Sequence, residues 1–371
     1  MAGLNETPSG NRIHIAFFGR RNAGKSTLVN ALTGQEVAIV SDVAGTTTDP
    51  VSKAMEILPL GPCLITDTAG LDDEGPLGEE RVRRSLEVLE KVDVAVWVDM
   101  DGADDSTRVR FEAACAARNI PVLVYRRGDS VVGLKRRIAE IQLADVPRPL
   151  IADLVRPGDT VVCVCPIDES APKGRLILPQ QQIVRELLDA GAAALVCQPE
   201  MLGKALASCP PPRFVITDSQ AFGAVSKVVP KEVPLTSFSI VFARAKGDLA
   251  AYCAGAGAMK NLRDGDVVLV AEGCTHHRQC NDIGTVKLPR WVERYAGVRP
   301  TFEFCSGNAF PGNLSRYALV IQCGGCMLTR RAVQARIARC RTAGVPITNY
   351  GIAIAACHGI RVSPASCMVM R

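Results

Sequence analysis

The stretch that decides the fold of this chain reads Arg12-Ile13-His14-Ile15-Ala16-Phe17-Phe18-Gly19-Arg20-Arg21-Asn22-Ala23-Gly24-Lys25-Ser26. Its first half is a short apolar run, rich in β-branched and aromatic residues, that ends at Gly19 and predicts a buried strand. Its second half is the GxxxxGK[ST] P-loop, and a helical pattern follows from Gly24. A P-loop in this setting closes backbone N–H groups around phosphates at the N-terminus of a helix. The stretch therefore predicts a phosphate-binding α/β domain.

Each residue type in this loop has a physical role. The glycines let the backbone approach the phosphates, Lys25 neutralises the β and γ charges, and Ser26 can ligate Mg²⁺. Downstream, Asp67-Thr68-Ala69-Gly70 closes a strand. That placement suits a carboxylate that reaches Mg²⁺ through water and a glycine whose amide meets the γ-phosphate. The loop Gly45-Thr46-Thr47-Thr48-Asp49 lies between the two and offers a second hydroxyl ligand.

Together these three segments resemble the GTPases, and the Gly-Thr-Thr pattern with Asn22 resembles their TrmE and Era branch. The resemblance implies GTP and GDP as ligands, with Ser26, Thr47 and Asp67 on Mg²⁺ and Asn22 on K⁺. The residues expected to bind the nucleotide are Gly19, Arg20, Asn22, Ala23, Gly24, Lys25, Ser26, Thr27, Asp67, Gly70 and Asp129.

Two departures from Ras-like patterns affect hydrolysis and base recognition. Leu71 follows the DxxG glycine, where Ras-like proteins carry a glutamine, and leucine cannot orient a water by hydrogen bonding. We therefore expect slow hydrolysis that depends on potassium and on G-domain pairing. The guanine-reading NKxD motif is reduced to Arg126-Arg127-Gly128-Asp129, which keeps only the carboxylate and leaves guanine selectivity open.

Glu79 stands where TrmE-like proteins carry a catalytic glutamate. A solvated carboxylate on a helix is the alternative interpretation. The residues expected to take part in catalysis are Lys25, Thr47, Gly70 and Glu79.

Alternation of apolar strands with helical stretches continues along the chain and predicts mostly parallel sheets. We expect a P-loop GTPase domain over 1–158, followed by two further parallel-sheet α/β domains over 159–262 and 263–371. The strands expected in the first domain are 12–18, 63–66, 94–98 and 120–124, with helices near 79–91, 106–118 and 131–143. Those expected in the second and third are 161–165, 194–197, 214–217, 238–242, 267–270, 318–321 and 352–356, with a helix over 328–342.

Composition excludes several classes of protein. Of the 371 residues, 47% are hydrophobic and 22% charged, which is typical of α/β material and not of a disordered chain. The net charge of +5 is too small for the footprint of a dedicated nucleic-acid binder. No apolar stretch is long enough to span a membrane, and 1–12 lacks the apolar core of a signal peptide. The expected location is the cytoplasm, without nucleic-acid or membrane partners.

Fifteen cysteines are unusual for such a chain. In a reducing compartment they indicate metal ligands or buried apolar residues. Cys323-Gly324-Gly325-Cys326 and Cys274-Thr275-His276 each follow a predicted strand, and the carboxyl ends of neighbouring parallel strands converge at one edge of a sheet. We expect the helix that follows Cys326, with Arg330 and Arg331, to lower the thiol pKa values. The ligand types admit a structural zinc or an iron–sulfur cluster.

The other cysteines are weaker candidates. Cys63, Cys115, Cys163, Cys165 and Cys197 are expected in apolar cores. The weaker candidates for a supplementary metal ligand are Cys280, Cys305 and the pair Cys357-His358.

A TrmE-like G domain followed by CxH and CGGC resembles the HydF family of FeFe-hydrogenase maturation GTPases. The resemblance spans nearly the whole chain, because further segments are similar to sequences of that family: 166–168, 171–179, 217–222, 235–239 and 345–351. It implies a dimerisation domain over 159–262, and a cluster-binding and tetramerisation domain over 263–371. A 4Fe-4S cluster on Cys274, Cys323 and Cys326, with His276 as the tentative fourth ligand, is implied as well.

The family's activity is implied in the same way. A member acts as scaffold and carrier of a diiron subcluster precursor, which it receives with two radical-SAM maturases and delivers to apo-hydrogenase. GTP would serve as a switch of domain pairing and partner exchange. The family usually has His directly before CxxC, and this chain has Gln322, a poor iron ligand. Two alternatives remain open: a zinc-stabilised regulatory GTPase, and a TrmE/Era-like GTPase directed to RNA.

Overall fold

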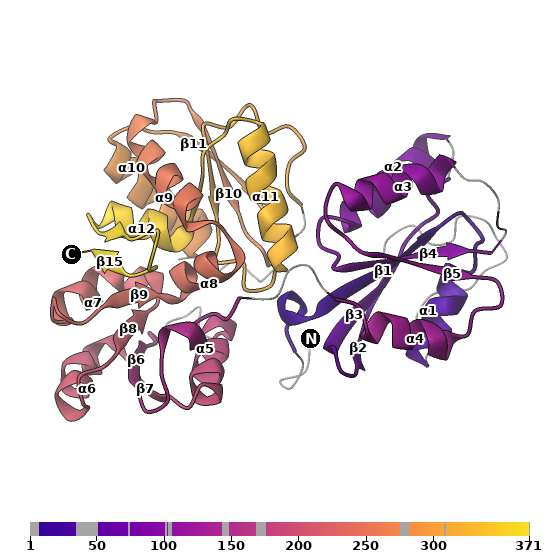
Figure 1. Cartoon of the computed structure of the whole chain (residues 1–371). Coiled ribbons are helices and arrows are strands. Elements are labelled where there is room, and N and C mark those ends of the chain that lie inside the picture. Colours follow the sequence, from indigo (N-terminus) through magenta and orange to yellow (C-terminus); the bar gives the residue numbers. More distant parts are fainter. Residues whose placement is uncertain are drawn as a thin grey trace. The chain divides into compact units, whose positions relative to one another are not determined.

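The computed structural model describes residues 7–34, 51–72, 75–100, 102, 106–142, 148–167, 176–274, 282–307 and 309–370. The chain divides into two compact units, Met1–Val146 and Pro147–Arg371 (Figure 1).

The first unit holds a five-stranded sheet in the order β2-β3-β1-β4-β5. β1 (Ile13–Gly19) lies at its centre, and β2 pairs antiparallel with β3 while the other pairs are parallel. The other strands are β2 (Val51–Ile57), β3 (Gly61–Asp67), β4 (Val94–Asp99) and β5 (Val122–Arg126). β1, β3, β4 and β5 were predicted, whereas the antiparallel edge strand β2 was not.

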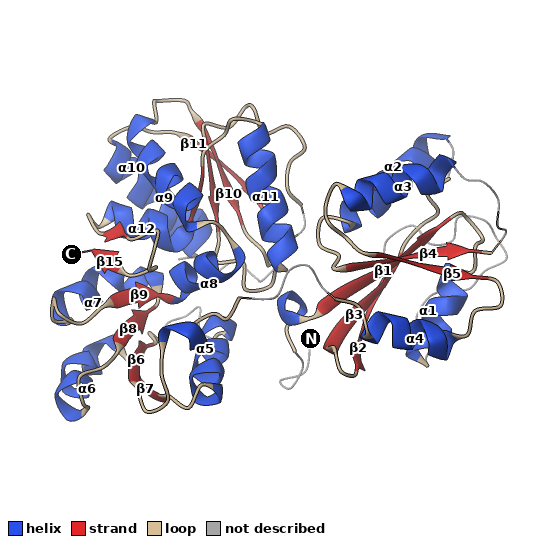
Figure 2. Ribbon diagram, viewed as in Figure 1, coloured by secondary structure: helices blue, strands red, loops and turns tan. Residues whose placement is uncertain are grey.

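Helices cover both faces of this sheet (Figure 2). α1 (Lys25–Thr33) and α4 (Val131–Ala139) pack on one face through Leu28, Leu134 and similar side chains. α2 (Gly75–Val88) and α3 (Ser106–Ala116) pack on the other, where Phe111 contacts Trp97 and Phe18. The centre of the sheet is therefore buried on both sides, which explains why β1 reads as a continuous apolar run.

The second unit holds two four-stranded parallel sheets, in the orders β7-β6-β8-β9 and β11-β10-β12-β13. In both sheets the strands thus lie in the spatial order second, first, third, fourth along the chain. The strands of the first are β6 (Thr160–Val164), β7 (Ala193–Cys197), β8 (Phe214–Thr217) and β9 (Leu235–Ser237). Those of the second are β10 (Val267–Ala271), β11 (Thr301–Cys305), β12 (Leu319–Gln322) and β13 (Ile347–Asn349). A small antiparallel pair, β14 (Arg361–Val362) and β15 (Val369–Met370), lies near the C-terminus.

The helices of the second unit follow its strands. They are α5 (Leu178–Asp189), α6 (Leu202–Ser208), α7 (Phe222–Val228), α8 (Phe238–Lys246), α9 (Leu249–Ala258), α10 (Leu288–Ala296), α11 (Arg330–Thr342) and α12 (Tyr350–Cys357).

Two predicted strands are wrong. Residues 238–242 lie in α8 and residues 352–356 lie in α12. In both places a three-residue strand ends at a polar residue that caps the helix: Ser237 accepts from Ile240 N, and Asn349 accepts from Gly351 N. Both helices are buried on nearly every side, so their apolar runs carry no helical period that would distinguish them from buried strands.

The two sheets of the second unit share one hydrophobic core. A single cluster of buried side chains includes Val162 and Val215 of the first sheet together with Val268 and Val320 of the second. α9 packs so closely on β13 that a Cβ on Gly255 would lie 2.0 Å from the Ile347 carbonyl oxygen. The boundary expected at residue 262 stays a prediction, because one core spans both sides of it.

Candidate functional site

The P-loop lies where the sequence predicts it, between β1 and α1. Lys25 is buried, and its Nζ donates to the carbonyl oxygens of Gly19 (3.4 Å) and Arg20 (2.6 Å). Asn22 has a left-handed backbone with φ of 60° and an exposed side chain. The loop thus curls around the ammonium group of Lys25, which is the group expected to meet the β- and γ-phosphates.

Two of the three predicted Mg²⁺ ligands, Ser26 and Asp67, lie in contact at the end of β3. Ser26 Oγ donates to Asp67 Oδ2 at 2.5 Å. Asp67 is fully buried, and its Oδ1 has no hydrogen-bond partner among the described residues. Burial raises the pKa of the Asp67 carboxyl, while the Ser26 hydroxyl and the Lys25 charge act in the opposite direction. A hydroxyl and a buried carboxylate with an open oxygen fit a hard cation such as Mg²⁺.

Gly70 touches the P-loop itself. A Cβ at this position would lie 2.7 Å from Arg21 N and 2.9 Å from Arg21 Cα, so no larger residue fits without moving the loop. Leu71 N donates to Gly19 O at 3.2 Å, and the Leu71 side chain is buried. Leu71 is therefore part of the domain core, and its side chain adds no polar group near the phosphate loop.

The reduced base-recognition motif forms a turn after β5. Asp129 Oδ2 accepts from Arg126 N at 2.9 Å, and Arg137 Nη1 lies 3.8 Å from the same carboxylate oxygen. The Tyr125 hydroxyl donates to Asp129 O at 2.8 Å. One oxygen of Asp129 thus has a backbone partner, and the expected role of this carboxylate in guanine recognition stays a prediction.

Some predicted residues of this domain cannot be placed against the loop. Thr47 lies outside the described residues, as do Thr46 and Thr48. Glu79 is exposed on α2, and Thr27 is exposed in the first turn of α1. Their expected roles stay predictions.

The two cysteine segments of the second unit do converge. β10 and β12 are parallel neighbours, with Ala271 opposite Gln322, so the residues after them leave the sheet at the same edge. Cys323 Sγ accepts from Gly273 N at 3.0 Å and from Gly325 N at 3.4 Å. The amide that precedes Cys274 therefore contacts the first thiol of CGGC, as expected from the strand order.

The described residues show no group of three Cys, His, Asp or Glu side chains that is arranged as a metal site. Thr275–Asn281, which includes His276 and Cys280, lies outside the residues that the structure describes. What is described fits an iron–sulfur group in one respect, because a sulfur that receives two backbone N–H groups is a typical cluster thiolate.

The expectation of lowered thiol pKa values is wrong for the free thiols. Burial raises the pKa of Cys323, and it raises the pKa of Cys326 to about 11. The cations that act against this effect are Arg336 on Cys323 and Lys246 on Cys326. Desolvation of a thiolate in this loop therefore outweighs the helix N-terminus that the sequence suggested.

Lys246, at the end of α8, holds the CGGC loop. The residue is buried, and its Nζ donates to the carbonyl oxygens of Gly325 (3.2 Å), Cys326 (3.3 Å) and Leu328 (2.8 Å). Sequence reasoning missed this contact, since about 80 residues separate the partners.

The N-terminus of α12 holds the loop from a second direction. Asn349 Nδ2 donates to Cys323 O at 3.2 Å, and Asn349 Oδ1 accepts from Ser239 Oγ at 3.0 Å. Gly351 N donates to the same serine oxygen at 3.2 Å. Ser239, in the first turn of α8, and Asn349, the cap of α12, thus meet beside Cys323, and the Asn349 amide fixes the Cys323 carbonyl.

The Gln322 side chain is bonded within the protein interior. It is buried, its Nε2 donates to the Tyr252 hydroxyl at 3.3 Å, and its Oε1 has no partner among the described residues. The amide is thus bonded to a buried phenol, and the expectation that Gln322 is a poor iron ligand stays a prediction.

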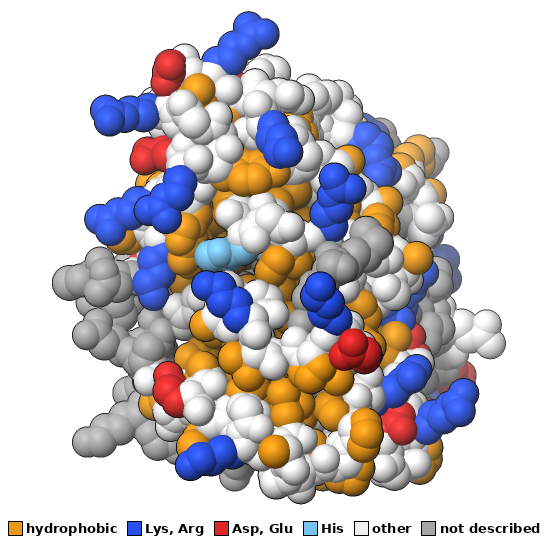
Figure 3. All heavy atoms as spheres, turned by 90° about the vertical axis from the view of Figure 1, so that its left-hand side faces the viewer, with side chains coloured by type: hydrophobic (Ala, Val, Ile, Leu, Met, Phe, Trp, Pro, Cys, Tyr) orange, Lys and Arg blue, Asp and Glu red, His pale blue; other side chains and the backbone are white. Residues whose placement is uncertain are grey.

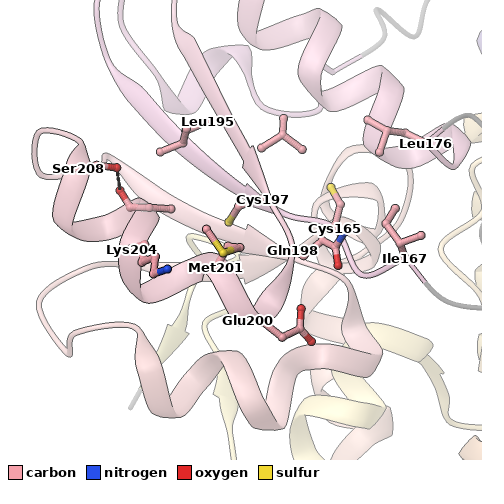
Figure 4. Close-up of a pocket in the computed structure, with 12 residues that line it drawn as sticks. Cys165, Ile167, Leu176, Leu195, Cys197, Gln198, Glu200, Met201, Lys204 and Ser208 are labelled. Atoms are coloured by element: carbon pink, nitrogen blue, oxygen red, sulfur yellow. Dashed lines mark hydrogen bonds between the residues drawn. The ribbon is translucent and has the colours of Figure 1, made fainter.

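A separate open pocket of about 860 Å³ lies at the carboxyl ends of β6 and β7 (Figure 4). Its lining includes Cys165, Cys197 and Met201, with Glu200 and Lys204 as charged groups. Cys163 and Cys165 are buried as predicted, whereas Cys197 is half-buried and lines this pocket. In the face drawn in Figure 3, exposed hydrophobic side chains form patches between lysines and arginines.

No helix among the residues that the structure describes is long and apolar enough to cross a membrane. Of the supplementary ligand candidates, Cys305 ends β11 and Cys357 ends α12, and both are half-buried.

The mostly parallel sheet, the P-loop around Lys25 and the Ser26–Asp67 contact define a P-loop GTPase domain, which a second α/β unit follows along the chain. Comparison with known families identifies both parts. The model described as "50S ribosome-binding GTPase" matches residues 14–126, "Hydrogen maturase F dimerization domain" matches 150–247, and "Hydrogen maturase F tetramerization domain" matches 250–363. The last two together cover more than half of the chain, and the chain belongs to the hydrogen maturase F family.

Two curated relatives are similar to about a quarter of this chain. The tRNA modification GTPase MnmE of Acinetobacter baumannii is 40% identical over 102 residues, which are 27% of this chain and 22% of that protein. GTPase Der of Wolinella succinogenes is 45% identical over 98 residues, 26% of this chain and 20% of that protein. The chain thus spans about a fifth of the length of these relatives. A solved structure of Era from Aquifex aeolicus, bound to GDP and aluminium fluoride, is 17% identical with a TM-score of 0.28, covering 82% of this chain and 94% of that one.

Proposed function

We propose that this chain is a GTP-regulated scaffold of FeFe-hydrogenase maturation. It holds a 4Fe-4S cluster on Cys274, Cys323 and Cys326, accepts a diiron subcluster precursor from radical-SAM maturases, and delivers it to apo-hydrogenase. Two matched hydrogen maturase F domains support this proposal. The observation that carries it is the contact of Gly273 N with Cys323 Sγ, which joins the residue before Cys274 to the first thiol of CGGC.

The cluster supplies an iron site that can exchange its fourth ligand. The protein supplies the thiolates, the Gly273 and Gly325 amides that bond to Cys323, and the Lys246 cation that fixes the loop carbonyls. His276 is proposed as the exchangeable ligand, since the buried Gln322 amide is a poor one. Release of cargo then requires only that one weak ligand be replaced, while three thiolates stay in place.

The nucleotide acts as a switch in this proposal. Mg²⁺ bound by Ser26, Thr47 and Asp67 would join the γ-phosphate to the Thr46–Thr48 loop, and hydrolysis would release that loop. K⁺ held near Asn22 and the Glu79 carboxylate would support hydrolysis, because Leu71 cannot orient a water. Lys25→Ala should abolish hydrogenase activation while the cluster stays bound, and full activation by this variant would contradict the switch.

The pocket beside β7 supports a homodimer, and the matched tetramerisation domain supports association of dimers. β7 is an edge strand of its sheet; Val196 within it is 41% exposed, and Met201, which follows it, is 47% exposed. An exposed apolar edge strand is a template for pairing with another chain. Sedimentation equilibrium tests the proposal, and a monomer at every concentration would contradict it.

None of the described cysteines is in a disulfide, which supports a reducing compartment such as the cytoplasm as the place of action.

The experiment that tests the scaffold function is a metal assay on anaerobically purified protein. Iron, acid-labile sulfide and zinc per chain are measured for the wild type, for Cys323→Ser and for Cys253→Ser. Cys253 is a matched control, because it is a half-buried thiol of the same unit whose Sγ lies 3.6 Å from Val362 O.

Two outcomes separate the candidate functions. Iron and sulfide that are present in the wild type and in Cys253→Ser, but lost in Cys323→Ser, support the cluster. Zinc without sulfide would refute it and would make the third domain the structural module of a regulatory GTPase.

A further inference from the structure

Arg336 is a buried cation that forms no ion pair with a carboxylate among the residues that the structure describes. Its side chain lies on α11 and is only 4% exposed. Nη2 donates to Gly307 O at 2.6 Å, and the guanidinium lies over the Phe310 ring, 4.9 Å from its centroid. Nη1 is buried without a hydrogen-bond partner among the described residues.

Such an arrangement is costly unless an anion completes it. Guanidinium stays protonated in proteins, so Arg336 cannot escape the cost of burial by losing its proton. Buried charges are normally paired or bind an ion, and a neutral carbonyl and an aromatic ring offset only part of the desolvation. Arg336 therefore has unused capacity for a negative charge at Nη1.

The side chains near Arg336 indicate which group supplies the negative charge that it lacks. The side chains that interact electrostatically with it are Cys323, Cys305 and Tyr252, while Arg339 repels it. The pKa of Tyr252 is raised by burial, so this phenol stays neutral. Cys323 is the neighbour that becomes an anion once it ligates a metal, since metal-bound thiols are deprotonated.

Lys246, the other buried cation near this loop, does something different. Its Nζ is bonded to three carbonyl oxygens of the 325–328 segment, so its charge is used to fix the backbone. Arg336 instead keeps one N–H group, Nη1, buried without a hydrogen-bond partner among the described residues, and its positive charge acts on Cys323. The two cations thus divide the tasks of holding the loop and of balancing its charge.

We propose that Arg336 is the counter-charge of the Cys323 thiolate and of the iron–sulfur group bound through it. The inference rests on the proposed cluster site and assigns to it a residue outside the ligand set. A fixed positive charge beside one thiolate favours the form of the cluster that carries more negative charge. Arg336 therefore raises the reduction potential of the cluster and makes its reduced state accessible.

The test compares three variants at the cluster and needs no hydrogenase. Arg336→Met removes the charge and keeps an apolar stem over Phe310, and Arg336→Lys keeps the charge. Arg339→Met is the matched control: Arg339 lies over the same ring, 5.1 Å from its centroid, but is not among the main influences on Cys323. Each protein is reconstituted anaerobically and titrated by EPR against a series of redox mediators.

The expected result is a lower potential in Arg336→Met only. The ratio of reduced to oxidised cluster at a fixed potential should fall at least tenfold, which is about 59 mV for one electron. Arg336→Lys should restore most of this loss, and Arg339→Met should behave as the wild type. An unchanged ratio in Arg336→Met would overturn the inference.

Two further outcomes are also decisive. If Arg336→Met and Arg336→Lys both fold, by circular dichroism, but neither retains iron, then the planar contacts with Gly307 and Phe310 matter rather than the charge, and the inference is wrong. If Arg336→Met loses iron while Arg336→Lys retains it, charge compensation is supported. Wild-type protein without iron and sulfide would refute the proposed function itself, so the two failures are distinguishable.

Discussion

Two glycines of α9 should respond to alanine with opposite signs. A Cβ on Gly255 would lie 2.0 Å from Ile347 O and 2.4 Å from Ile347 C, both backbone atoms of β13. A Cβ on Gly257 would meet nothing within 4 Å. In both cases alanine gains about 1 kcal/mol of helix propensity over glycine.

The magnitudes decide the sign at each position. Real Cβ atoms do not approach other atoms within about 3 Å, so Gly255→Ala must push α9 away from β13 by on the order of 1 Å. Overpacking of this kind costs typically 1–3 kcal/mol, and a clash with backbone belongs at about the upper end. Gly255→Ala should therefore destabilise the second unit by about 2 kcal/mol, whereas Gly257→Ala should stabilise it by about 0.5–1 kcal/mol.

The chain itself provides the assay, because its two tryptophans lie in different units. Trp97 is in the first unit and Trp291, on α10, is in the second. In a Trp97→Phe background, urea unfolding followed by the fluorescence of Trp291 reports the free energy of unfolding of the second unit. Equal shifts for the two glycine variants, or a stabilised Gly255→Ala, would refute the close packing of α9 on β13.

The remaining predictions concern the first unit. Gly70→Ala places a methyl group 2.7 Å from Arg21 N, so the P-loop must move at a cost of about 1–3 kcal/mol. This cost should weaken GTP binding roughly 5- to 150-fold in calorimetric titration. Unchanged affinity would show that the loop does not need this glycine. Burial lowers the pKa of His14, whose Nε2 lies 2.9 Å from Ser9 O. The unfolded chain therefore takes up the proton first as the pH falls below about 6.5, and the unit should lose stability there by at most about 1.4 kcal/mol per pH unit. His14→Gln should flatten this dependence, followed by Trp97 fluorescence in a Trp291→Phe background; an equal acid loss in both proteins would assign it to other groups.

The sequence predicted the elements that have local signals. A buried strand that ends in a P-loop is recognisable because the glycines and the helix start lie within a few residues of it. It did not predict α8 and α12, since Phe238–Phe242 and Ile352–Ala356 are buried on nearly every side and carry no helical period. The caps Ser237 and Asn349 are the local signals of these helices. Most residues of β2 are exposed or half-buried, so the strand lacks the apolar pattern that predicts a buried strand.

The candidate site divides in the same way. The convergence of Cys274 and Cys323 follows from the order of parallel strands, and Gly273 N on Cys323 Sγ agrees with it. Lys246 and Arg336 were not predictable, because their partners lie 79 and 29 residues away and depend on how helices pack on the sheet. The thiol pKa values were predicted with the wrong sign, since the degree of burial is a tertiary property.

The shared core of the second unit limits how relatives of this chain can be recombined. The two family models meet at Gly247–Leu249, between α8 and α9, where a chimera would naturally be cut. Exchange of 150–247 alone would replace Lys246 and Ser239, which hold the CGGC loop, and half of a continuous hydrophobic core. A functional graft must therefore transfer 147–371 as one piece, because the two matched domains form one folding unit.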